Sequence, residues 1–258
     1  MTRAAAIQVQ AHVLNALLVR EARIGFGGTW WGYLWVVLQP AVVLTALVLI
    51  FNLLGRHAPF GPSLALFFGT GVLIVEFYSR MSASLTGALT ANAHLAPFAV
   101  VKPMDSVMAR WLLVSTVHGV IAIAFFSGAI WLSGVAPPAD LAQMVVAYGI
   151  LAAFCLFAGL WHALIFSAWR GWRFVERMLA RPVFFISGVF YIPSLLPEVL
   201  RNILWFNPLL HLVEMMRSGL SGNYHSTMIS LQYLGLLTLG LGATGLLVER
   251  ISRGKRGR

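Results

Sequence analysis

Five apolar stretches, each long enough to cross a lipid bilayer as a helix, dominate this 258-residue sequence. A membrane-spanning helix needs about 20 predominantly apolar residues, because the hydrocarbon core of a bilayer is about 30 Å thick. The stretches cover residues 31–54, 64–83, 107–132, 141–169 and 227–248. Only 10% of the residues are charged, whereas soluble domains have about 25%. The sequence therefore predicts an all-α polytopic membrane protein in which residues 1–258 form a single transmembrane domain.

A sixth, shorter apolar stretch covers residues 178–192. Because Lys and Arg collect in short loops on the cytoplasmic side of a membrane, their distribution tests whether this stretch crosses. With six spans and the N-terminus inside, all of the 18 Lys and Arg residues except Arg56, Arg201 and Arg217 lie inside. Without the sixth span, the basic tail at 250–258 would lie on the opposite face. We therefore predict six transmembrane helices with both termini in the cytoplasm.

The net charge of +10 raises the question of an anionic partner. The basic residues lie in short loops and a tail beside the spans, where anionic lipid headgroups account for them. We therefore expect membrane lipids, and no nucleic acid, as partners. Cys155 is the only cysteine, so an intramolecular disulfide is excluded.

Residues 194–225 follow the fifth span and are expected on the outer side. Apolar residues at helical spacing predict one short amphipathic helix near 195–203. A second is predicted at 208–217, with Asn207 as N-cap and Pro208 at the first helical position. Both are too short to span, so they either lie in the interface and seal the fold or form a re-entrant hairpin that closes a translocation path. The candidate residues of this outer gate are Glu198, Arg201, Asn207, Pro208, His211, Glu214 and Arg217.

Residues 1–30 form a cytoplasmic N-terminal segment that contains a predicted interfacial helix at 7–24. Its apolar face is interrupted by Gln10 and Glu21 and consists of Ile7, Ala11, Leu14, Leu17, Leu18 and Ile24. Four aromatic residues follow: Trp30, Trp31, Tyr33 and Trp35. They are typical of a belt that anchors a span at the headgroups, and the alternative is that some of them stack on a sugar ring.

The inner loop at 90–105 joins the second and third spans. It is longer than a tight turn and contains Pro97 and Pro103. A short helix across it would provide a docking surface for a cytoplasmic partner, and the alternative is a solvated connection.

Three motifs together resemble the membrane (permease) subunits of bacterial ABC-2-type exporters of capsular polysaccharide. They are LLVREARIGFGGTWWGYLWVVLQP (17–40), NAHLAPFAVVKPMDSVMAR (92–110) and NPLLHLVEMMR (207–217). The resemblance implies a homodimer that works with two copies of a separate ABC ATPase and exports lipid-linked acidic polysaccharide across the bacterial inner membrane. It also implies a periplasm-spanning export protein as a partner. The family often has Arg-Pro where this chain has Ala99-Val100, so no role of that arginine is carried over.

The resemblance implies that the inner loop docks into the ATPase, with coupling candidates Asn92, His94, Leu95, Phe98, Lys102 and Asp105. The candidates for the substrate path are Arg23, Trp30, Trp31, Tyr33, Trp35 and Tyr191. A nucleotide-binding P-loop requires Gly-x4-Gly-Lys-Ser/Thr, but Lys102 and Lys255 are followed by Pro103 and Arg256. We therefore expect no cofactor in this chain and expect ATP and Mg to bind to the partner ATPase.

Three alternatives to capsule export follow from parts of the sequence. The first is export of another polymer, such as O-antigen or teichoic acid. The second is ion-coupled transport, for which Glu76, His118, His162 and Glu214 are available, although an intramembrane histidine can simply form a hydrogen bond between helices. The third is an intramembrane serine protease built on the GLSG sequence at 219–222, which lacks a base on another span. No metal-binding motif is present, so no metal site is predicted.

Overall fold

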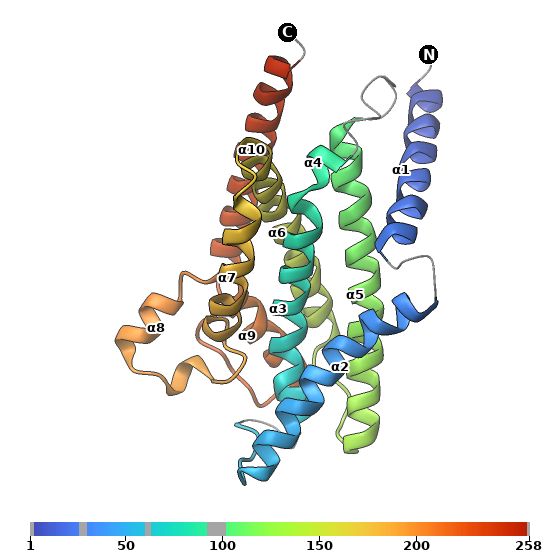
Figure 1. The fold of residues 1–258 in the computed structure, drawn as a ribbon. Coiled ribbons are helices and arrows are strands. Elements are labelled where there is room, and N and C mark those ends of the chain that lie inside the picture. Colours follow the sequence, from blue (N-terminus) through green and yellow to red (C-terminus); the bar gives the residue numbers. More distant parts are fainter. Residues whose placement is uncertain (1–2, 26–29, 60–62, 92–101, 257–258) are drawn as a thin grey trace.

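The computed structural model describes residues 3–25, 30–59, 63–91 and 102–256, and the regular secondary structure in these ranges is entirely helical (Figure 1). The helices are α1 (Arg3–Gly25), α2 (Trp30–Leu53), α3 (Leu64–Thr86), α4 (Ala88–Ala91), α5 (Pro103–Ser133), α6 (Leu141–Ala168), α7 (Trp172–Ile186), α8 (Glu198–Leu204), α9 (Pro208–Leu220) and α10 (Leu231–Arg256), with a 3-10 turn at Pro193–Leu195. The prediction of an all-α fold is therefore confirmed for the described residues.

Five segments are long and apolar enough to cross a membrane. They are Leu34–Leu53, Leu64–Ala91, Pro103–Ser133, Leu141–Ala168 and Leu231–Ser252. These segments match the five long stretches predicted from the sequence, which confirms a polytopic membrane protein. α7 is not among them, because it has 15 residues and carries three arginines and a glutamate. The predicted sixth crossing at 178–192 therefore remains a prediction.

The chain nevertheless returns through the bundle between α6 and α10. α7 starts near the end of the bundle where α1 begins and α10 ends, and runs back toward α9 (Figure 1). α10 then runs back to the end of the bundle where α1 begins (Figure 1). The first turn of α1 and the last turn of α10 therefore lie at the same end of the molecule.

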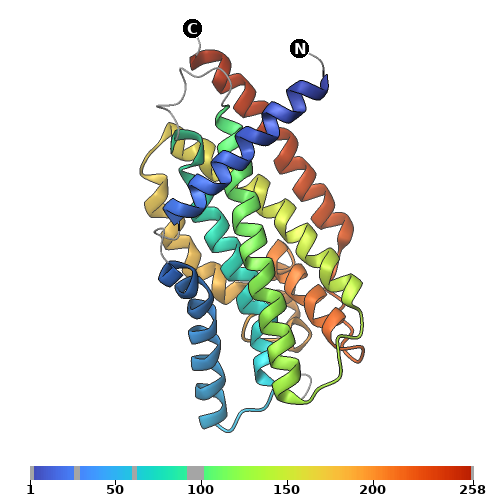
Figure 2. The same cartoon turned by 90° about the vertical axis from the view of Figure 1, so that its right-hand side faces the viewer.

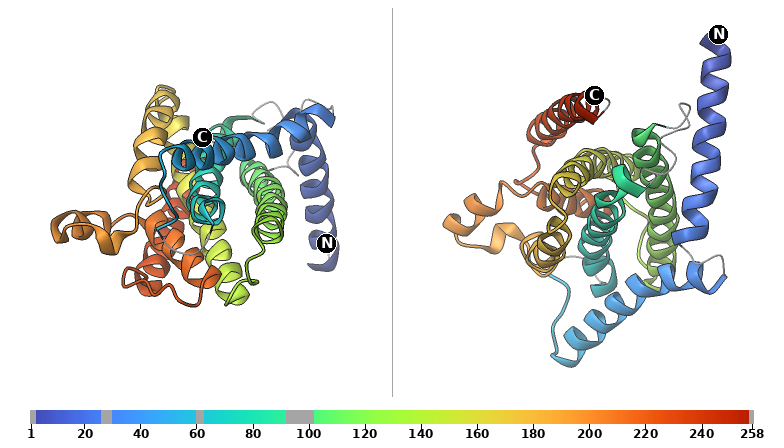
Figure 3. Two further views of the ribbon diagram at one scale, coloured as in Figure 1. Left: turned by 90° about the horizontal axis from the view of Figure 1, so that it is seen from below. Right: turned by 45° about the horizontal axis from the view of Figure 1, so that its top comes forward.

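α3 is the centre of the packing. It contacts α6, α5, α2, α7 and α9, which surround it in the views of Figure 3. Of the apolar window of α3, 72% is buried, against 12% for α2 and 17% for α5. Phe67, Phe68, Phe77, Met81 and Leu85 of α3 are almost fully buried. The outer faces of α2 and α5 thus remain for lipid or for another subunit.

α1 packs across α5, as Figure 2 shows. The predicted apolar face of this helix is partly wrong. Ile24, on the predicted apolar face, is 61% exposed, whereas Glu21, which interrupts that face, is buried. The reason is that Glu21 has a basic partner on α5, described below, so that its burial does not leave a charge unpaired.

Close packing between α3 and α6 depends on Gly159. A Cβ atom at this position would overlap Cδ1 of Leu85 and lie 3.0 Å from its Cβ, and the Leu85 side chain is fully buried. We expect Gly159→Ala to lower the stability by about 1–3 kcal/mol, because overpacking forces side chains out of their rotamers. The melting temperature of the purified protein in detergent measures this effect. Gly149→Ala on the same helix is the control, since a Cβ there meets no atom within 4 Å. Equal melting temperatures for both variants would contradict the packing.

Candidate functional site

The sequence correctly predicts how α9 starts. The Asn207 side chain accepts a hydrogen bond from the Leu209 N–H (3.0 Å), and Pro208 occupies the first turn. The same side chain donates from its amide to Ile186 O (3.0 Å) and Ser187 Oγ (3.1 Å). α9 therefore begins attached to the end of α7 and packs against α6 and α3. It is buried from Leu209 to Arg217.

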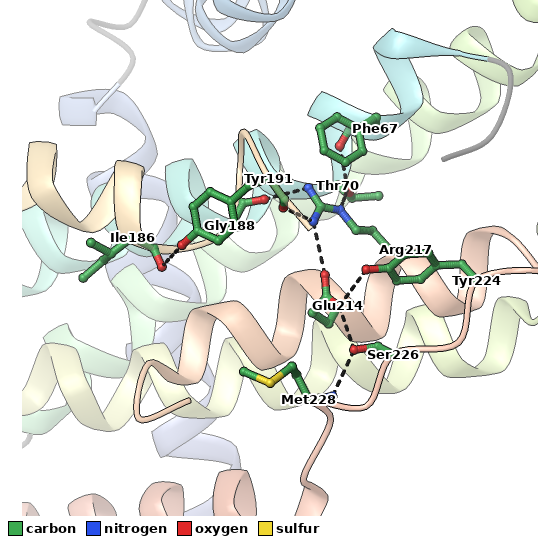
Figure 4. A network of polar contacts seen from close by, with 10 residues as sticks. All are labelled: Phe67, Thr70, Ile186, Gly188, Tyr191, Glu214, Arg217, Tyr224, Ser226 and Met228. Atoms are coloured by element: carbon green, nitrogen blue, oxygen red, sulfur yellow. Dashed lines mark hydrogen bonds and ion pairs between the residues drawn. The ribbon is translucent and has the colours of Figure 1, made fainter. Parts of the chain in front are cut away.

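The centre of the site is Arg217, whose side chain is completely buried (Figure 4). The guanidinium donates hydrogen bonds to the carbonyl oxygens of Gly188 (2.7 Å) and Tyr191 (2.9 Å), to Thr70 Oγ1 (3.3 Å) and to Glu214 Oε1 (3.2 Å). Its carbon Cζ also lies 4.2 Å from the centre of the Phe67 ring. Arg217 thus joins α9 to α3 and to the turn that follows α7.

Glu214 completes the pairing and extends it to the loop before α10. Its Oε2 accepts hydrogen bonds from the hydroxyls of Tyr224 (2.7 Å) and Ser226 (2.6 Å). Burial lowers the pKa of Arg217, and the charge of Glu214 opposes this effect. Burial raises the pKa of Tyr224, and Glu214 adds to the increase, so the phenol remains a donor. The buried charges are therefore paired and hydrogen-bonded, as a low-dielectric environment requires.

His211, in its neutral form, links the segments on either side of α9. Nε2 lies 2.6 Å from Trp205 O, and Nδ1 lies 3.2 Å from the Ser230 N. A carbonyl accepts and an amide N–H donates, so these contacts place the proton on Nε2. Burial lowers the pKa of His211, which agrees with a neutral ring. The residue has a structural role, since it holds the end of α8 to the start of α10.

The structure does not bring all predicted outer-gate residues together. Asn207, His211, Glu214 and Arg217 lie in or at the start of the packed helix α9. Glu198 and Arg201 lie on α8, which projects away from the bundle (Figures 1 and 3). α8 has no buried residues, and Val199 and Ile203 are strongly exposed. The two halves of the predicted hairpin therefore have different surroundings.

A second polar cluster lies at the opposite end of α3 and α5. Asp105 caps the start of α5 by accepting from the Lys102 N–H (2.8 Å) and also accepts from Gln10 of α1 (2.6 Å). Arg110 forms two hydrogen bonds with Glu21 of α1 (2.9 and 3.3 Å) and one with Ser84 O of α3 (2.8 Å). These contacts hold α1 to the end of the inner loop and to the first turns of α5.

The inner-loop candidates are only partly described. Lys102 and Asp105 occupy the N-cap and third positions of α5. The other four, Asn92, His94, Leu95 and Phe98, lie outside the described residues.

Those substrate-path candidates whose side chains the structure describes do not form one site. Arg23, Trp31 and Trp35 are exposed, and the two tryptophans are four residues apart on one face of α2. Tyr191 lies in the turn at Arg217, where its hydroxyl donates to Ile186 O (2.8 Å). The side chains of Trp30 and Tyr33 lie outside the described part of the chain.

Sequence reasoning missed the arginine face of α7. Arg173, Arg177 and Arg181 are spaced four residues apart on α7, so they share one helical face, and Arg170 lies just before the helix. The four side chains are exposed, and Arg173 stacks on Phe166 at 4.6 Å. The spacing was readable in the sequence, but these residues were counted only as positive charges that orient the spans.

Five long apolar helices and a buried, fully paired arginine define a multi-pass helical membrane protein. In the described residues, no three His, Cys, Asp or Glu side chains come together as metal ligands. The ABC-2 type transporter family matches residues 12–221, and the chain therefore belongs to this family of membrane transport subunits. The resemblance seen in the three sequence motifs is thus confirmed, and the chain is a transport subunit and not an enzyme.

Three relatives illustrate the similarity. The polysialic acid transport protein KpsM of Escherichia coli is 29% identical over 244 residues, which cover 94% of each chain. The capsule polysaccharide export inner-membrane protein CtrC of Neisseria meningitidis serogroup A / serotype 4A is 26% identical over 247 residues, or 95% of this chain and 93% of CtrC. The O-antigen export system permease protein RfbA of Klebsiella pneumoniae is 24% identical over 236 residues, or 86% of this chain and 85% of RfbA.

The buried pair predicts a large effect of removing Arg217. We expect Arg217→Met to destabilise the protein by about 3–5 kcal/mol, because it leaves Glu214 buried without its positive partner. Thermal unfolding and yield in detergent measure the loss. The control Arg201→Met removes the same charge from the projecting helix α8 and should change stability little. If both variants lose the same stability, Arg217 does not hold the site together.

Proposed function

We propose that this chain is the transmembrane permease subunit of an ATP-driven exporter that moves lipid-linked capsular polysaccharide across the bacterial inner membrane. Relatives named for transport of polysialic acid and export of capsule polysaccharide match nearly the full length of both chains. The relative named for O-antigen export is less similar and covers less of this chain, so O-antigen export is the second candidate.

The arginine face of α7 is the main observation that supports an acidic substrate. From Arg173 to Arg181 the positive charges extend over about 12 Å of helix, and Arg170 precedes them. Exposed guanidinium groups bind carboxylates and phosphates in a planar, bidentate geometry. A row of weak sites would allow a long acidic chain to move from one arginine to the next, whereas a single tight site would stop it.

The energy is proposed to come from two copies of a separate ABC ATPase that bind ATP and Mg. The inner loop at 90–105 is the proposed docking element. Movement of this loop would reach α1 through the contacts of Asp105 with Gln10 and of Arg110 with Glu21. We further propose a homodimer, for which the exposed apolar faces of α2 and α5 offer surface, and a periplasm-spanning export protein at the outer end.

The contacts of the ionisable residues disfavour an ion-coupled transporter. Glu214 is paired with Arg217 (3.2 Å), and Glu76 lies 3.5 Å from Arg80. His162 accepts a hydrogen bond from the Trp172 indole (2.9 Å). His118 Nδ1 lies 3.2 Å from Val114 O of its own helix. No contact in the described residues joins two of these four groups, so they do not form a chain of proton carriers.

The arginine face yields a direct test of the acidic substrate. We expect Arg177→Gln to reduce surface polysaccharide several-fold, because it interrupts the row of charges. Surface polysaccharide is measured on intact cells, with the amount of membrane protein measured in parallel. The control Arg250→Gln removes an exposed arginine from α10. Normal export by the Arg177→Gln variant at a normal protein level would remove the support for this path.

The proposed six spans place both termini in the cytoplasm and residues 194–225 outside. In a Cys155→Ser chain, a cysteine in the Ser221→Cys variant should react with an impermeant thiol reagent in intact spheroplasts. A cysteine in the Ser252→Cys variant, at the other end of the bundle, should react only after lysis. The reverse pattern would contradict the orientation.

A further inference from the structure

A polar cavity lies where α2 ends and α3 begins, at the end of the bundle opposite to the start of α1 (Figure 1). This α2–α3 cavity has a volume of about 560 Å³. Its polar lining consists of Asn52, Arg56, His57, Ser63 and Ser133, and Ala65 is one of its small apolar residues. None of the described residues that line it is acidic, and Arg56 contributes a positive charge.

The position of Arg56 is fixed by the local backbone. Gly55 adopts a left-handed conformation (φ 65°), which ends α2. The Gly55 N–H donates to Asn52 O (3.0 Å), and the Arg56 N–H donates to Phe51 O (2.9 Å). This pair of hydrogen bonds is a Schellman motif, which terminates the helix and directs the next residue away from its axis. Arg56 therefore lies directly after the end of α2, in the wall of the cavity.

The opposite wall is also suited to an anion. α3 begins here with Ser63 as its N-cap, and Leu64 and Ala65 line the cavity. The first amides of a helix have no acceptor within the helix and carry partial positive charge. Ser133 donates to Ser63 Oγ (3.1 Å), which joins the end of α5 to this wall. Side chains and a helix start from three elements therefore converge on one polar volume.

We propose that the α2–α3 cavity binds an anionic group, either the carboxylate of an acidic sugar or the phosphate of a lipid headgroup. Arg56 supplies the charge, and Asn52, Ser63 and Ser133 supply hydrogen bonds. Of the three arginines predicted outside, Arg217 is fully paired in the interior and Arg201 lies on the projecting helix α8. Arg56, by contrast, lines the α2–α3 cavity. The sugar source of the anion rests on the proposed function, whereas binding of an anion does not.

The test measures the charge preference of a cysteine in the cavity. The full chain carries Cys155→Ser and Ala65→Cys and is placed in phosphatidylcholine nanodiscs. Its rates of reaction with an anionic and a cationic methanethiosulfonate reagent are compared. One positive charge about 6 Å away changes each rate about threefold in opposite directions, so we expect a ratio of about ten in favour of the anionic reagent. Ser194→Cys, exposed before α8, provides the reference ratio.

Two variants assign the preference to the cavity. Arg56→Gln should abolish the preference at Ala65→Cys and leave the ratio at Ser194→Cys unchanged. Arg56→Lys should retain most of it, which separates charge from a loss of local structure. An absent preference, or one that survives Arg56→Gln, would overturn the proposal.

Two further arms identify the source of the anion. If it is an acidic sugar, tetragalacturonate should slow the anionic reagent at Ala65→Cys in phosphatidylcholine, and neutral galactotetraose should not. If it is a lipid phosphate, the reaction should slow when phosphatidylglycerol is added to the nanodiscs. Protection by tetragalacturonate or by phosphatidylglycerol supports an anion site. Protection by neither of them, or protection by galactotetraose, contradicts it. A failure here would leave the export assay of Arg177→Gln unaffected, so the two proposals can be distinguished.

Discussion

A buried arginine can remain in a membrane protein only if its charge is paired and its donors are satisfied. Arg217 meets this requirement with groups from three separate parts of the chain: α3, the turn after α7 and its own helix. Glu214, its partner, then binds Tyr224 and Ser226 in the next loop. Moving any one of these parts alone would leave a charge or a carbonyl unpaired in the interior. α9 and its surroundings are therefore expected to move as one unit.

α3 and α5 connect this unit with the other end of the molecule. α3 contributes Thr70 and Phe67 to the Arg217 site and Ser84 O to Arg110. α5 begins at the capping contact of Asp105 and ends at Ser133 in the α2–α3 cavity. Both are long, continuous helices, so a displacement near the inner loop would be transmitted along rigid elements to the opposite end. This arrangement suits a subunit that receives its energy from a partner at one end and releases its substrate at the other.

The sequence predicted the parts of the fold that the lipid environment alone determines. Long apolar stretches must form helices in lipid, because every backbone N–H and C=O group needs a partner within the segment. The five spans could therefore be found without tertiary information. Hydropathy could not decide whether α7 crosses the membrane. Its arginine face makes the helix polar on average, while its other face is apolar.

The polar contacts were hidden because they join distant residues. Glu21 was judged an interruption of an apolar face, and its partner Arg110 is 89 positions away. The N-cap of α9 was readable because Asn207 and Pro208 act locally, but the contacts of Arg217 with Thr70 depend on packing between helices. The residues of the predicted outer gate were grouped by sequence proximity, and the fold divides them between a buried and a projecting helix.

The most direct test of the central claim is ATP-driven polymer transport in a reconstituted system. The chain is inserted into proteoliposomes with its partner ATPase facing outward, and lipid-linked acidic polysaccharide is supplied in the outer leaflet. With ATP, the polymer should become resistant to an externally added lyase, and omission of this chain, the ATPase or ATP should prevent this. Transport by this chain alone under a proton gradient, or no protection with all components present, would contradict the account.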